Sequence, residues 1–430
     1  MSEHNKAGEH FILPAQLCVG LHVHLDLSWT EHPFPFSSFK IKSLDQISTI
    51  QSLGLSRVRY SPDKSDAQPQ PVASASEMPA AAAPPLSREN DPAFEAKRER
   101  MKRLSAQRAK AAACQKALLS SARTVKLIKQ NVFAQPEETK AMATTLITSI
   151  ADSMMVDADV SIQLMADKVG GEEVYFHSLN VSLLSMMLAK ELKAPLPVVQ
   201  KVGMGALFHD FGELEIPDHV VRKLEARTKS EIALMQMHCE YGLGLGKKMG
   251  LAGEVMQVIA QHHEKVDGSG YPCALKGEQM TLMARIVSLV NAYDELCNPP
   301  NPAKSLTPHE ALSTMFAQQR SQYDQLAMST FVRCMGVYPP GTLVVLSNGA
   351  IAMVASVNTS KPLRPVVLVY DPAVPKEEAI LVDLEAEPDV SVIKTLRPSQ
   401  LPSDAYAYLS PRKRMTYYFD SESGKAGSGS

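Results

Sequence analysis

The chain has 430 residues, too many for one ordinary domain, and its 45% hydrophobic and 21% charged residues are typical of globular proteins. A formal net charge of −2 excludes a general electrostatic attraction to nucleic-acid polymers or membranes. The six cysteines form no C-x-x-C pair, and no apolar run approaches the length of a membrane span or a cleavable leader. We therefore expect reduced thiols in a cytoplasmic protein.

The first segment, residues 1–61, is predicted to be a small β-rich module with one helix. LCVGLHVHLDLSW alternates apolar and other residues from Leu17 to Leu27, which is strand periodicity. A short helix from Leu44 to Ile50 and a strand from Val58 to Tyr60 follow. Residues 62–92 are rich in Pro, Ala and Ser, and this composition predicts a linker.

Residues 93–136 contain no Gly and only one Pro, at their end, and predict a long basic helix. Apolar residues at a spacing of three and four allow two interpretations. In the first, residues 97–128 form the seam of a homodimer. In the second, the helix packs its apolar face on its own domain. Its basic residues are interpreted as a solvated face, because no aromatic residues are interleaved with them.

Residues 137–335 repeat helical apolar stripes, and residues 336–400 change to β periodicity around the turn signal Asn348-Gly349. Residues 401–430 are predicted to be a tail with a disordered end. The predicted fold is therefore multidomain and mainly α: an all-helical core between a small N-terminal α+β module and a small C-terminal all-β module.

Five histidines and several acids fall on the inward faces of successive predicted helices. They are His177, His209, His238, His262 and His263. Imidazoles prefer divalent transition metals, and a carboxylate can bridge two ions, so Asp210 beside His209 is the natural bridge. A two-metal site inside a helical domain is the best single explanation of these residues.

A loop, EKVDGSGYP, follows the histidine pair. Asp267, Gly268 and Gly270 predict a tight turn, and Tyr271 and Pro272 predict a rigid edge. Beside a metal centre such a loop would shape a substrate pocket; alone it is a turn.

The blocks HDFGELEIP, a lone histidine about thirty residues later, and HHEKVDGSGYP resemble the HD-GYP domain of the HD phosphohydrolase superfamily. The match runs from about Glu173 to Leu296, and VGLHVHLDLSW with HPFPF resembles the uncharacterised domain that often precedes it. The resemblance implies an all-helical metal-dependent phosphohydrolase that hydrolyses cyclic di-GMP to pGpG or GMP.

Carried over by position, the resemblance implies site residues of three kinds. The metal ligands would be Glu173, His177, His209, Asp210, His238, His262, His263 and Asn291, holding two ions, or three with Glu173, with Fe or Mn expected. Catalytic roles would fall to Asp210, Glu213 and Arg285, the last by orienting carboxylates or else as a plain surface salt bridge. Substrate contacts would come from Asp267, Gly268, Gly270, Tyr271, Pro272 and Asp294.

Three positions depart from the family. The aspartate of ARIxxVADxFDAL is Asn291, the lysine of HDIGK is Glu213, and the RPYR-type stretch is absent. Asn291 offers only a neutral oxygen, so it should weaken binding of the ion shared with His177 and His209. Glu213 would repel a phosphate if it faces the substrate, or supply a ligand if it turns inward.

Three hypotheses follow for the whole chain. The first is a metal-dependent phosphodiesterase that acts on cyclic di-GMP or a related nucleotide. The second is a degenerate member that binds metal, nucleotide or, through the GYP loop, a signalling protein without turnover. The third, a helical scaffold with structural histidines, predicts no bound metal.

Overall fold

The computed structural model describes residues 10–27, 32–34, 37–71, 102, 116–156, 162–164, 175–357, 361–372, 374, 376, 379–409 and 417–419. The chain divides into two compact units, one built around the N-terminal module and the other around the helical region and most of the C-terminal strands. No described helix is both long enough and apolar enough to cross a membrane.

The N-terminal module is a four-stranded antiparallel sheet with one helix. Its strands β1 (His10–Ile12), β2 (His22–His24), β3 (Ser38–Lys40) and β4 (Val58–Tyr60) lie in the order β1-β4-β2-β3. Helix α1 (Leu44–Ser52) begins at Ser43, whose hydroxyl accepts the Gln46 backbone N–H. The predicted helix and last strand are confirmed.

The predicted alternation from Leu17 to Leu27 is only partly a strand. Leu21, Val23 and Leu25 are buried, but Val19 is 44% exposed and Gly20 has φ +98°, so the chain turns before β2 begins. The module also continues past residue 61 into the expected linker. The backbone N–H groups of Asp66 and Gln70 donate to Gly20 and Gln16, and most of the remaining linker lies outside the described residues.

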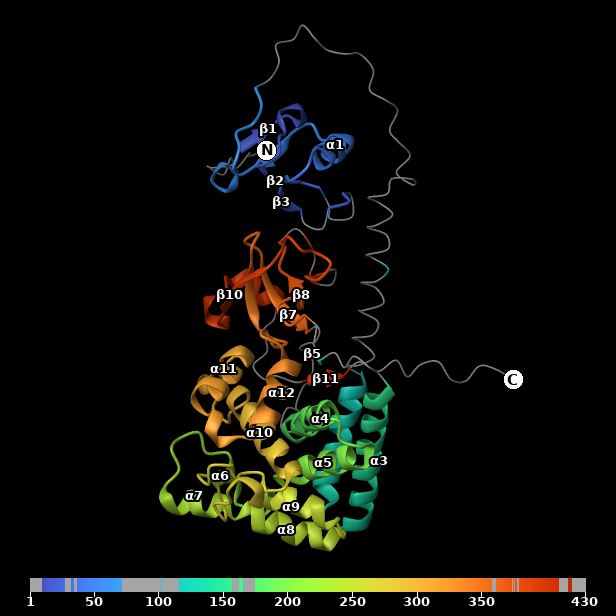
Figure 1. Ribbon diagram of the computed structural model, residues 1–430, viewed down its shortest axis with the longest axis vertical. Coiled ribbons are helices and arrows are strands. Elements are labelled where there is room, and N and C mark those ends of the chain that lie inside the picture. Colours follow the sequence, from blue (N-terminus) through green and yellow to red (C-terminus); the bar gives the residue numbers. More distant parts are fainter. Residues whose placement is uncertain are drawn as a thin grey trace, which may run out of the picture. The chain divides into compact units, whose positions relative to one another are not determined.

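The helical region surrounds α4 (Phe176–Glu191), which is buried along almost its whole length because it is apolar on all sides. Helices α3, α5, α10 and α12 pack against it, and Figure 1 shows α3, α4 and α5 side by side. The remaining helices follow in chain order. The bounds are α3 (Pro136–Val156), α5 (Leu196–Phe208), α6 (Asp218–Val221), α7 (Lys229–Gln236), α8 (His238–Met249), α9 (Gly253–Gln261), α10 (Leu282–Cys297), α11 (Pro308–Gln318) and α12 (Gln325–Met335). The predicted helical core is confirmed.

Residues 116–131 form the described part of the long basic helix. Its apolar stripe Leu118, Ala122, Val125 and Ile128 is fully buried within a single chain. This burial agrees with an amphipathic helix packed on its own domain. The homodimer seam stays a prediction, and most of its N-terminal half lies outside the described residues.

The C-terminal strands form an antiparallel sheet, as predicted. The hairpin turns at Asn348 and Gly349, where Gly349 has φ +82°. The strands are β6 (Leu343–Leu346), β7 (Ile351–Ser356), β8 (Val366–Val369), β9 (Ile380–Asp383) and β10 (Val392–Leu396).

Two further strands of this sheet come from unexpected places. Strand β5 (Ile162–Leu164) precedes the central helix α4, and β11 (Tyr417–Phe419) lies in the expected tail. They pair with each other, and β5 also pairs with β7. The tail prediction is therefore wrong for α13 (Ser403–Leu409) and β11, while residues 420–430 lie outside the described part of the chain.

Candidate metal centre

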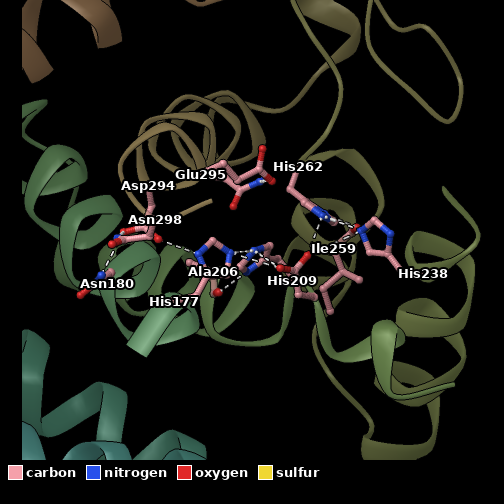
Figure 2. Close-up of polar contacts among 12 residues, drawn as sticks. His177, Asn180, Ala206, His209, His238, Ile259, His262, Asp294, Glu295 and Asn298 are labelled. Carbon is pink, nitrogen blue, oxygen red and sulfur yellow. Dashed lines mark hydrogen bonds and ion pairs between the residues drawn. The ribbon is translucent and has the colours of Figure 1, made fainter. Parts of the chain in front are cut away.

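The ends of four helices bring the predicted histidines to one place (Figure 2). His177 lies in the first turn of α4, and His209 and Asp210 follow α5 directly. His238 begins α8, and His262 ends α9. Because the 3-10 helix η5 (Phe211–Glu215) turns the chain sharply after Asp210, the carboxylate points back among the imidazoles.

Three of these histidines share one hydrogen-bond arrangement. Each donates its Nδ1 hydrogen to the backbone carbonyl three residues earlier, and a carbonyl oxygen can only accept. The hydrogen therefore sits on Nδ1, and the Nε2 lone pair is free to bind a cation. The pairs are His209 with Ala206 at 2.6 Å, His238 with Met235 at 2.5 Å, and His262 with Ile259 at 2.8 Å.

His177 reaches the same tautomer by a different partner. Its Nδ1 lies 2.7 Å from Oδ2 of Asp294, which is completely buried. The amides of Asn180 and Asn298 donate to the other oxygen of Asp294, at 2.9 and 3.0 Å. The predicted substrate contact of Asp294 is thus wrong: its carboxylate lies behind His177 and orients that ring.

The four Nε2 atoms meet in two pairs around Asp210. His177 and His209 are 3.2 Å apart, and Oδ2 of Asp210 lies 3.2 and 3.1 Å from them. His238 and His262 are 3.0 Å apart, and Oδ1 of Asp210 lies 3.6 and 3.4 Å from them. Each oxygen of one carboxylate therefore faces a different pair of imidazoles, as the predicted bridge requires.

This donor set fits divalent cations. Two unprotonated nitrogens at about 3 Å direct their lone pairs at each other, and only a cation or a proton between them removes the repulsion. Two carboxylates, Asp210 and Asp294, hold the pKa of His177 well above its usual value, although burial, the largest single influence, lowers it. Nitrogen and oxygen ligands in two clusters suit two divalent transition metals. The clusters are Asp210, His238, His262 and His263, and His177, His209 and Asp210, with ligand atoms within 4.8 Å of one another in each.

His263 connects this centre to the GYP loop. Its ring stacks on Tyr271, with centroids 4.5 Å apart and planes at 20°. Burial and the neighbouring His262 hold the pKa of His263 well below its usual value, so the imidazole is neutral and its lone pair is available. Tyr271 also lies edge-on to His238, with centroids 6.4 Å apart. The loop thus reaches the metal cluster through one aromatic side chain.

Buried hydrogen bonds hold the rest of the GYP loop. Glu264, fully buried, accepts the backbone N–H groups of Cys273 and Leu275 at 2.6 and 2.9 Å. Asp267 is exposed and binds Ser269, so it shapes the turn. The remaining predicted loop residues define the backbone: Gly268 has φ +81°, a Cβ on Gly270 would overlap the backbone of residues 263–265, and the peptide between Tyr271 and Pro272 is cis.

Glu213 lies on η5, is partly buried, and belongs to neither cluster of possible metal ligands among the described residues. Burial and the charge of Asp210 raise the pKa of Glu213 to about 8. Two positive charges oppose this shift, Lys129 and His177. Lys129 comes from the helix of residues 116–131, and its Nζ lies 5.4 Å from the centre of the Phe211 ring. The described residues thus place a cation near the position where the family has a lysine, although it comes from a different element.

Asn291 lies on α10 and is almost completely buried. Its Nδ2 donates to Glu295 at 3.0 Å, and its Oδ1 has no hydrogen-bond partner among the described residues. Glu173 lies outside the described residues. Of the two roles predicted for Arg285, the structure agrees with the salt bridge: its guanidinium binds Asp324, the N-cap of α12, at 3.2 Å. Its predicted role in orienting the carboxylates of the site is therefore corrected.

Sequence reasoning missed several contributors. Lys129 is one of many lysines in a basic helix, and only its packing against Phe211 distinguishes it. Glu264 stands inside the block HHEKVDGSGYP, but its role and that of Asn180 depend on buried hydrogen bonds that the motif does not reveal. Glu295 could be noticed only as a second acid next to Asp294.

Three family models match the chain in sequence order. Residues 11–145 match a domain of unknown function (DUF3391), residues 159–326 an HD domain, and residues 343–404 a KOW domain associated with HD domains. The middle match contains every described residue of the candidate centre except Lys129. A helical domain with a histidine and aspartate metal centre is the class of protein that the fold and this site define. Residues 159–326 match the HD domain family, and the HD-GYP resemblance of the motifs in this region is confirmed.

Named relatives are similar to parts of the chain. The chain is 31% identical over 231 residues to a cyclic di-GMP phosphodiesterase of Pseudomonas aeruginosa, covering 54% of this chain and 56% of that protein. It is 31% identical over 168 residues to a cyclic di-GMP phosphodiesterase response regulator of Xanthomonas campestris, covering 38% and 43%. A 3'3'-cGAMP-specific phosphodiesterase of Vibrio cholerae is 38% identical over 90 residues, covering 20% and 17%. The chain thus spans about half the length or less of these relatives.

Proposed function

We propose that this chain is a metal-dependent phosphodiesterase that hydrolyses a cyclic dinucleotide, and that cyclic di-GMP is its substrate. The observation that carries the proposal is the position of the Asp210 carboxylate. Each of its two oxygens faces a different pair of histidine Nε2 atoms, at 3.1 to 3.6 Å. The relatives named as cyclic di-GMP phosphodiesterases support the choice of substrate.

When bound, two divalent cations at these groups supply Lewis acidity, which lowers the pKa of water and offsets negative charge on a phosphodiester. We propose iron or manganese, because the donors are mainly imidazoles with carboxylates. The residues of the chain supply the frame. The backbone carbonyls and Asp294 fix the imidazole tautomers, and Asp210 joins the two halves of the centre.

Lys129 supplies positive charge for the substrate phosphate in this proposal. Its ammonium lies over the Phe211 ring, and Glu213 and Asp210 are the charges that act on it. Divalent cations would take up most of the charge of Asp210. Because the pKa of Glu213 is raised to about 8, that carboxyl is largely protonated at pH 7, and the charge of Lys129 would attract an anionic group, as a lysine at position 213 would otherwise do.

The test is metal content and hydrolysis measured on the same purified full chain. We expect about two ions per chain, as two-metal sites require, and pGpG or GMP from cyclic di-GMP with Mn²⁺ or Fe²⁺ in reducing buffer. The same assay with 3'3'-cGAMP decides which cyclic dinucleotide is preferred. Asp210→Asn should lose both ions and product, whereas Asp218→Asn, an exposed aspartate on α6, should lose neither. Fewer than two ions with no product would contradict the proposal.

A second candidate function is nucleotide binding without turnover, and Asn291 is the observation that favours it. A neutral amide stands where the family has a metal-binding aspartate. Binding of cyclic di-GMP measured by calorimetry, with two bound ions and no product, would identify this function.

A further inference from the structure

The hydrogen bond between Asn291 and Glu295 defines the orientation of the Asn291 amide. Both residues lie on α10, one turn apart, and Nδ2 of Asn291 lies 3.0 Å from Oε1 of Glu295. Only the NH₂ group of an amide can donate to a carboxylate, so the other atom must be the carbonyl oxygen. The neighbour on the helix therefore leaves Oδ1 free for a different partner.

That oxygen is buried and lacks a hydrogen-bond partner among the described residues. Asn291 is 1% exposed, and buried acceptors without a partner are rare in folded proteins. The surroundings favour a cation as the missing partner. Burial raises the pKa of Glu295, and the charges of His177 and His209 lower it, as expected for a carboxyl near the first half of the centre. Figure 2 shows Glu295 beside the histidines, on the helix that also carries Asp294.

We propose that Asn291 and Glu295 together do the work of a single aspartate at the ion held by His177, His209 and Asp210. Asn291 binds the ion through Oδ1. Glu295 fixes the amide and supplies the negative charge that asparagine lacks, and accepting the N–H also makes the carbonyl oxygen more negative. Glu295 is thus a positioning residue. This inference rests on the proposed metal centre and identifies a residue that the family pattern does not contain.

The chemistry predicts an unusual dependence of one substitution on the other. In the natural chain, Glu295→Ala removes a needed charge and should weaken the affinity for one of two ions about 10- to 100-fold, as loss of a partner behind a metal ligand does. In an Asn291→Asp background the aspartate carries the negative charge itself, so the same change should weaken binding much less. The effect of Glu295→Ala therefore depends on the residue at position 291.

The experiment is a double-mutant cycle on the full chain, stripped of metal and reloaded with Mn²⁺. Affinity and stoichiometry are measured by calorimetry and by the electron paramagnetic resonance signal of free Mn²⁺, so that neither depends on turnover. Glu295→Gln keeps an acceptor oxygen but removes the charge, and it should fall between wild type and Glu295→Ala. Glu278→Ala, an exposed glutamate on the 3-10 helix Gly277–Gln279, is the matched control and should change nothing.

The outcomes separate this inference from the proposed function. Two ions in wild type, with unchanged affinity in Glu295→Ala or purely additive effects in the cycle, would overturn the role of Glu295 and leave the metal centre intact. No bound ion in wild type would overturn both. Circular dichroism of each metal-free variant is the control that checks whether the variant is folded. A dependence on the residue at position 291 is not expected from a merely structural residue.

Discussion

Asp294 accepts a hydrogen bond from Nδ1 of His177, the ring nitrogen opposite to the one that faces Asp210. Its Oδ2 atom lies 2.7 Å from Nδ1, and Asp294 is fully buried. A carboxylate behind a histidine ligand fixes the ring and keeps the hydrogen away from the metal-facing nitrogen. Asp294→Asn can turn its NH₂ group toward Nδ1 and so favour the wrong tautomer. We expect Mn²⁺ affinity to fall about 10- to 100-fold, measured by calorimetry. An unchanged affinity would show that His177 needs no such support.

Gly212 lets η5 approach α8 so closely that no side chain fits between them. A Cβ at this position would overlap the carbonyl oxygen of His238 and lie 2.6 Å from the backbone nitrogen of Gly242. Gly212→Ala should therefore push His238 away from Asp210 and lower the free energy of unfolding by about 1–3 kcal/mol, typical of overpacking. Urea unfolding and metal content measure the two effects.

Gly244→Ala is the control for that substitution. Gly244 lies on α8, and a Cβ there meets nothing within 4 Å. Alanine favours a helix over glycine by about 1 kcal/mol, so this variant should be as stable as wild type or more so. Equal behaviour of the two variants would rule out the close approach at Gly212.

Metal binding should release a proton from His177. Asp210 and Asp294 both hold the pKa of this imidazole well above its usual value, so in the metal-free protein a proton occupies the place of a cation. A ligand nitrogen must lose that proton, and we expect release of about one proton near pH 7 and an affinity that rises with pH. Calorimetry in two buffers with different ionisation enthalpies counts the protons. Equal apparent enthalpies in both buffers would contradict this.

The same shift gives the metal-free protein a pH-dependent stability. Because the pKa of His177 is raised on folding, its contribution is fully present below the unfolded value of 6.5 and is lost as the pH rises through the folded value. His177→Gln should therefore destabilise the metal-free protein more at pH 6 than at pH 10. Denaturant unfolding at both pH values measures the difference.

If the proposed function is right, Lys129→Met should impair hydrolysis of the cyclic dinucleotide and leave metal binding unchanged. Methionine keeps the packing over Phe211 but removes the charge. If Lys129 meets the substrate phosphate, KM should rise about 10- to 100-fold, the range for a lost hydrogen bond to a charged group. Lys126→Met, one turn earlier on the same helix, is the control. Loss of metal in Lys129→Met would instead mean that the lysine only balances Glu213.

The sequence predicted local features well and long-range ones poorly. Helix α1, strand β4 and the hairpin at Asn348 and Gly349 follow from periodicity and turn chemistry within a few residues. Strands β5 and β11 have three residues each and pair across more than 250 positions, and so short a segment carries no periodic signal.

The site shows the same contrast. The five histidines and Asp210 were found because spacing along helices and a family motif mark them. Asp294 was placed at the substrate because nothing in the sequence reveals which side of His177 it occupies. Lys129 comes from a helix some eighty residues before Asp210, and only tertiary packing brings its charge to the centre.

The pairing of strand β5 limits where the chain can be truncated without exposing a strand edge. It lies between α3 and α4, yet its partners are β7 and β11, and β11 also contacts α4. The HD domain match ends at residue 326, so a fragment cut there would keep β5 and lose both neighbours, leaving an open strand edge that invites aggregation. During synthesis, α4, which carries His177, cannot make its contacts with β11 until residues 417–419 have been added. The domain that carries the candidate metal centre is therefore completed only by β11, the last strand among the described residues.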